Sequence, residues 1–147
     1  MLILLVSCLF SCRAQNHLAG EKMEDLVLVA QDEYSGFSEF GTMVIRDTKS
    51  LNKFYSQINK TRKPGLPVPM IDFSKEMAIV VCLPEQSGGS EPMLSKIDES
   101  ESELNIAIKL KGLKTTENEG NTSLVNPFYV YKMPLATKTI NLKKEGW

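Results

Sequence analysis

The side chains best suited to nucleophilic or metal chemistry are few in this chain and lie far apart in the sequence. There is one histidine, His17, and there are three cysteines, Cys8, Cys12 and Cys82. Nucleophilic catalysis needs a nucleophile, a base and an orienting group close together. A structural zinc site needs about four ligands, most often Cys and His. Because this set supplies neither, we predict that the protein is not an enzyme and has no catalytic residues, no metal site and no cofactor.

The remaining reactive groups have plain structural explanations. Cys82 lies in the apolar run 77–83 and is expected to be a small buried hydrophobic residue. Asp72, just before that run, is expected to cap a turn with its own side chain. Glu99, Glu101 and Glu103 alternate along an acidic segment that we interpret as a solvated turn.

Cys8 and Cys12 belong to an apolar run that begins near the first residue. The run 2–10 is about half as long as the roughly 20 residues of a membrane-spanning helix, which is typical of a signal peptide. The residues LFSC, ending at Cys12, resemble the bacterial lipobox, in which the cysteine is acylated and becomes the new N-terminus. The residues LVSC, ending at Cys8, fit the same pattern. We favour Cys12, because cleavage at Cys8 would shorten the apolar run to six residues.

This leader predicts where the protein works and how it is organised. We expect a lipoprotein signal peptide over residues 1–12, a flexible polar tether over 13–24 and a single domain over 25–147. The lipid on Cys12 would anchor the chain to a membrane of the bacterial cell envelope, on its periplasmic or cell-surface side. Net charge is −1, from 17 basic and 18 acidic residues without a long basic run, so nucleic-acid binding is not expected.

Hydropathy patterns predict an α+β fold that is mainly antiparallel β. A helix is expected from a cap at Asp47 or Thr48 to about Asn59, followed by an extended proline-rich loop. Its apolar face consists of residues spaced by three and four: Leu51, Phe54, Tyr55 and Ile58. We expect this helix to pack on a sheet of about seven strands, the last two forming a hairpin: 26–30, 41–46, 77–83, 93–98, 104–111, 128–133 and 137–142.

The order of these elements resembles the C-terminal domain of the PrcB family, named for a lipoprotein subunit of a bacterial surface protease complex. The resemblance covers roughly residues 41–142 and rests on short motifs. A segment DFS (72–74) precedes the central strand, and a strand with a proline and aromatic residues (127–131) comes near the end. In the family a loop like Thr-Gly-Gly-Tyr follows the central strand. Here Ser87, Gly88, Gly89 and Ser90 stand in its place, and the aromatic residue is lost.

The resemblance implies a non-catalytic domain that binds a partner protein, such as a protease or another envelope protein. The candidate partner-binding loop is Ser87 to Ser90, and the polar loop 114–123 is a second candidate, because binding residues collect on loops of rigid β scaffolds. An alternative function is that of a ligand carrier. Its pocket would be lined by the aromatic residues Tyr34, Phe37, Phe40, Phe128, Tyr129 and Tyr131.

Overall fold

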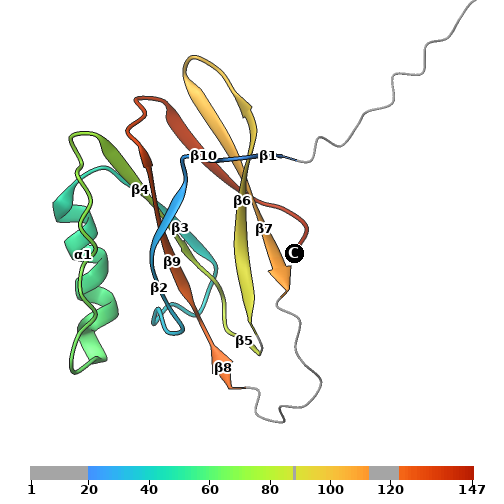
Figure 1. The fold of residues 1–147 in the computed structure, drawn as a ribbon. Coiled ribbons are helices and arrows are strands. Elements are labelled where there is room, and N and C mark those ends of the chain that lie inside the picture. Colours follow the sequence, from blue (N-terminus) through green and yellow to red (C-terminus); the bar gives the residue numbers. More distant parts are fainter. Residues whose placement is uncertain (1–19, 88, 113–122) are drawn as a thin grey trace, which may run out of the picture.

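The computed structural model describes residues 20–87, 89–112 and 123–147, which form two stacked β-sheets with one helix on the outer face of one sheet (Figure 1). The strands of the helix-covered sheet lie in the order β2-β9-β4-β3, and those of the outer sheet in the order β1-β6-β7-β10. The elements in chain order are β1 (Glu21–Lys22), β2 (Val27–Asp32), β3 (Gly41–Ile45), α1 (Thr48–Ile58), a 3-10 turn η1 (Asn59–Thr61), β4 (Glu76–Cys82), β5 (Gln86–Ser87), β6 (Ser90–Glu99), β7 (Glu103–Gly112), β8 (Leu124–Val125), β9 (Phe128–Pro134) and β10 (Thr139–Lys144).

The predicted α+β class is confirmed, since most strand pairs are antiparallel and α1 packs on a sheet. All seven predicted strands are present. The three additional strands, β1, β5 and β8, have two residues each. A two-residue strand has too few side chains to show a hydrophobic period, so sequence patterns do not reveal it.

Helix α1 begins and ends as the sequence predicts. Asp47 is the N-cap, and its carboxylate accepts a hydrogen bond from the backbone N–H of Ser50 at 2.8 Å. Asn59 is the C-cap and also holds the proline-rich strap that follows. Its side-chain amide donates to the carbonyl of Leu66 at 2.9 Å and accepts from the Leu66 N–H at 2.7 Å. The helix buries its predicted apolar face: Leu51, Phe54, Tyr55 and Ile58.

Strand β4 is the central strand because both of its faces are buried. Ala78, Val80 and Cys82 pack toward α1 in one core cluster. The alternate residues of β4, including Ile79 and Val81, pack toward the outer sheet in a second cluster. This position between two cores explains why the run 77–83 is apolar without alternation, as predicted for a strand buried on both sides.

The expected hairpin of the last two strands is not formed. β9 pairs antiparallel with β2 on one side and β4 on the other, so it has no free edge for β10. β10 instead crosses to the outer sheet and pairs in parallel with β7. Arg46 holds this crossing, because its guanidinium donates hydrogen bonds to the carbonyls of Ala136 and Lys138.

The segment expected to be a tether joins the domain before residue 25. Glu21 and Lys22 form β1, which pairs with β6, and Glu21 makes a 3.2 Å ion pair with Lys96. Gly20 permits this approach, since a Cβ atom there would lie 2.3 Å from the Ser95 hydroxyl. Both cysteines of the leader, Cys8 and Cys12, lie outside the described residues.

Candidate functional site

The two loops proposed from the sequence start from one small ribbon at the same end of the sandwich. Strand β5 leads into Gly88, and β8 follows the segment 113–122. β5 and β8 pair antiparallel, with Gln86 opposite Val125 and Ser87 opposite Leu124. Gly88 and residues 114–122 themselves lie outside the described residues, whereas Ser87 and Gly89 are exposed and Ser90 is half-buried. The fold thus gathers the flanks of both loops into one place.

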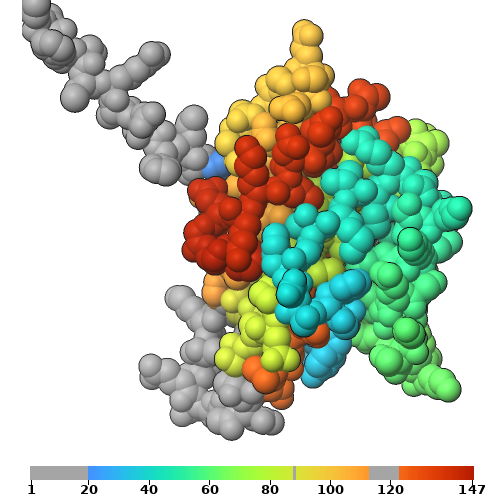
Figure 2. Space-filling model, turned by 180° about the vertical axis from the view of Figure 1, so that it is seen from behind, coloured from blue at the N-terminus to red at the C-terminus, as the bar shows by residue number. Residues whose placement is uncertain are grey.

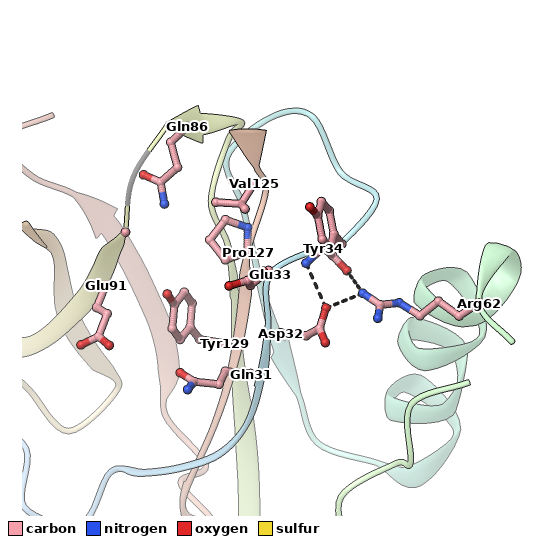
Figure 3. A pocket seen from close by; sticks show the side chains of 11 residues that line it. Gln31, Asp32, Glu33, Tyr34, Arg62, Gln86, Glu91, Val125, Pro127 and Tyr129 are labelled. Carbon is pink, nitrogen blue, oxygen red and sulfur yellow. Dashed lines mark hydrogen bonds and ion pairs between the residues drawn. The ribbon is translucent and has the colours of Figure 1, made fainter. Parts of the chain in front are cut away.

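A cleft of about 510 Å³ opens beside this ribbon. It lies between the end of β2, the ribbon and the start of β6, and Figure 2 shows the segments around β5, β8 and the loop after β2 meeting at the end of the molecule opposite the β6–β7 tip. The lining residues are Gln31, Asp32, Glu33, Tyr34, Arg62, Gln86, Gly89, Glu91, Val125, Pro127 and Tyr129 (Figure 3).

Asp32 is the polar centre of one wall of the cleft. It accepts from Arg62 Nη2 at 2.5 Å and from the backbone N–H of Tyr34 at 3.0 Å. Arg62 Nη2 also donates to the carbonyl of Tyr34. Because Arg62 follows the helical turn η1, this set of bonds joins the end of the helix to the end of β2. The wall is therefore fixed by hydrogen bonds from two distant parts of the chain.

The loop after β2 is also bound to the segment that precedes β9. The Asn126 N–H donates to the carbonyl of Glu33 at 3.0 Å, and the Ser35 N–H donates to the carbonyl of Asn126 at 2.8 Å. The Asn126 side chain donates to the carbonyl of Phe37 at 3.1 Å. These bonds give the backbone N–H and carbonyl groups of the loop hydrogen-bond partners, although the loop is not part of a regular strand. They also hold the loop against the ribbon.

Two tyrosines of β9 close the sandwich behind the cleft. The hydroxyls of Tyr129 and Tyr131 each donate to a carbonyl of β6, those of Ser90 and Pro92, at 3.2 Å. Burial raises the pKa of both phenols, and the negative charge of Glu91 raises it further. Glu91 and Tyr129 both line the cleft.

The reactive groups considered from the sequence lie apart from the cleft. Cys82 is 1% exposed in the core, and burial raises the pKa of its thiol to about 12, so it remains a protonated hydrophobic side chain near neutral pH. Asp72 caps a turn, as predicted, by accepting from the Ser74 N–H and hydroxyl. Within residues 20–87, 89–112 and 123–147, no group of three or more His, Cys, Asp or Glu side chains is arranged to hold a metal ion.

The aromatic residues proposed for a carrier pocket do not surround one cavity. Phe37 and Phe128 pack on the helix side of the sheet. Phe40, Tyr129 and Tyr131 pack between the two sheets, and Tyr34 is half-exposed at the cleft. Their separation into two cores gives the carrier function no support.

Comparisons with protein-family models, with curated proteins and with solved structures found no match to this chain. The part of the chain that the structure describes contains no helix long and apolar enough to cross a bilayer.

The sequence suggested the Ser87–Ser90 loop as a binding site, which stays a prediction, and did not indicate most of the residues of the cleft beside it. Asp32, Glu33 and Arg62 stand singly among other charged residues, and nothing local to them indicates that they meet. The one available signal was position: Glu33 and Tyr34 lie in the loop just after the strand that ends at Asp32, and binding residues collect on loops of rigid scaffolds.

Proposed function

We propose that this chain is a lipid-anchored protein of the bacterial cell envelope, and that its domain binds a partner protein at the end of the sandwich that carries the cleft. Cys12 would carry the lipid. The resemblance to the PrcB family suggests a protease, or another envelope protein, as the partner, with this domain as a non-catalytic accessory subunit or regulator.

One observation supports this proposal above the others: the cleft and the described flanks of the two loops lie at the end of the molecule away from the tether. The chain enters through β1, which pairs with Ser95 and Lys96 of β6. The cleft lies at the start of β6, beside Glu91. At about 3.3 Å per residue of strand, these positions are separated by roughly 15 Å along the strand. An anchor at the tether would therefore leave the cleft open to other proteins.

The experiment is site-specific photo-cross-linking of the full-length chain in its own envelope. A photo-reactive amino acid is placed at Leu124, which is 57% exposed beside the cleft. The matched control position is Ile97, which is 38% exposed near the point where the tether joins. We expect a discrete cross-linked protein from position 124 and none of that size from position 97.

Removal of Gly88 and Gly89 tests the loop itself. We expect this deletion to abolish the cross-link from position 124. A cross-linked species that forms equally from both positions, or that survives the deletion unchanged, would contradict a binding site at this end.

A further inference from the structure

The half of the cleft between β2 and β6 carries negative charge that the described protein does not neutralise. Figure 3 shows the side chains of Gln31, Glu33 and Tyr129 on the β6 side of the β2 end, and Asp32 on the other side with Arg62. Arg62 is the only cation among the lining residues, and it is already bound to Asp32. Two carboxylates, Glu33 and Glu91, therefore remain.

Neither carboxylate has an ion-pair partner within 4.0 Å among the residues that the structure describes. Lys111 faces Glu91 across the β6–β7 pair, and no ion pair joins them. Both glutamates are exposed to solvent. An anionic ligand would be repelled from this half of the cleft, and a cation would be attracted.

The floor of the cleft indicates which kind of cation fits. Val125, Pro127 and Tyr129 give it an apolar lining, and Gln31 and Gln86 add side-chain amides. A hard metal ion prefers a shell of oxygen ligands, which an apolar floor does not provide. A lysine or arginine side chain has both parts that this lining matches, because its aliphatic stem packs on apolar groups while its charged end reaches carboxylates and amide oxygens.

The rim of the cleft adds exposed apolar surface. Tyr34 is 50% exposed on one side, and Leu124 is 57% exposed on the other. Exposed aromatic and aliphatic side chains around a charged cleft are typical of a protein-binding surface rather than of a site for a free amino acid. The hydrogen bonds of Asp32 and Asn126 hold both sides in place before any partner arrives.

We infer that the cleft takes a lysine or arginine side chain of the partner protein, flanked by apolar residues, and that Glu33 and Glu91 are the residues that bind it. The inference rests on the proposed function and specifies its partner: a basic, partly apolar segment. Charge complementarity is the step that selects this partner over an acidic one.

The test uses two blocked five-residue peptides that differ only in charge, one with an arginine between two leucines and one with a glutamate there. Binding is followed by backbone amide shifts of the mature chain, at low salt. We expect the arginine peptide to shift the amides of Gln31, Glu33 and Glu91 and to bind at least about tenfold more tightly than the glutamate peptide. Added salt should weaken binding of the arginine peptide, because the attraction is between partly exposed charges.

A charge-matched pair of variants assigns the effect to the cleft. The double variant Glu33→Gln with Glu91→Gln should bind the arginine peptide about tenfold more weakly. The control, Glu101→Gln with Glu103→Gln at the far tip, removes the same charge and should leave the affinity unchanged. Equal binding of the two peptides, or equal loss in both double variants, would overturn the inference. If the peptides give no shifts while position 124 still cross-links a partner, the proposed function stands and the basic-residue inference falls.

Discussion

At the scale of single residues, Tyr55 is the one polar group whose burial is not compensated among the described side chains. It is 2% exposed, and its hydroxyl has no hydrogen-bond partner there. Burial, together with the negative charge of Asp32, raises the pKa of this phenol to about 12. A buried hydroxyl without a partner loses its bonds to water and gains none in return. The ring is still needed, since it packs edge-on against Phe54 and Phe128.

Tyr55→Phe therefore removes a cost and keeps the packing. We expect the free energy of unfolding to stay the same or to rise by up to about 1 kcal/mol, measured by urea denaturation. The control is Tyr129→Phe, which deletes a hydroxyl that does donate, to the Ser90 carbonyl at 3.2 Å. That variant should lose about 1 kcal/mol. A loss at Tyr55→Phe as large as in the control would show that its hydroxyl is bonded after all.

At the scale of elements, Arg46 helps to hold the segment that carries the last strand to the outer sheet. Its guanidinium binds two carbonyls of the crossing between β9 and β10, including that of Lys138 at 2.7 Å. Arg46→Met keeps a similar stem but removes both donors. We expect the free energy of unfolding to fall by about 2 kcal/mol, since hydrogen bonds from charged groups are among the stronger ones.

Hydrogen exchange makes the test specific to the crossing. In Arg46→Met the amides of β10 should exchange faster, while those of β2, on the far edge of the other sheet, should keep their protection. Unchanged protection in β10 would show that its parallel pairing with β7 holds the crossing without Arg46.

The same crossing marks the limit of prediction from sequence. Local signals sufficed for α1, because Asp47 and the apolar spacing from Leu51 to Ile58 act within a few residues. They also sufficed for β4, because its apolar run can be read as a buried strand without knowing which strands lie beside it. They failed for β9 and β10, because adjacent strands with a proline between them favour a hairpin, and only the pairing of β9 with both β2 and β4 excludes it.

The cleft was beyond local signals for a related reason. Arg62 and Asp32 are 30 residues apart, and the β5–β8 pair joins segments whose sequences show no strand period. Ser87 to Ser90 were predicted from paired glycines and a family resemblance, and of the described residues among them Gly89 lines the cleft. The pairing of β5 with β8 brings the described flanks of two separate candidate loops together at one end of the sandwich.

At the scale of the whole molecule, four carboxylates stabilise the fold. Two of them cap a helix or a turn, and the other two form ion pairs between elements that are distant in the chain. Hydrogen bonds to ionised forms hold the pKa of each below its ordinary range. The donors are the Ser50 N–H for Asp47 and the Ser74 hydroxyl for Asp72. For Glu76 the donor is Lys132, and for Glu99 it is Lys138, each a partner on another strand or loop. Ionised carboxylates thus stabilise the N-terminus of α1, the turn before β4 and contacts within both sheets.

The sign of the pH dependence follows from these directions. A carboxyl group whose pKa is lower in the folded chain adds stability above its unfolded pKa, about 4, and that stability is lost as pH falls through the folded value. We expect the melting temperature to be nearly constant from about pH 7 to 5 and to fall steadily below about pH 4. Glu76→Gln with Glu99→Gln should make this acid slope shallower, because both carboxyl groups bind protons more readily in the unfolded chain than in the folded one, and the variant lacks both. The control variant, Glu101→Gln with Glu103→Gln on the exposed tip, should leave the slope of melting temperature against pH unchanged. An equal change in both double variants would show that net charge, rather than the bonds of Glu76 and Glu99 to lysines, controls acid stability.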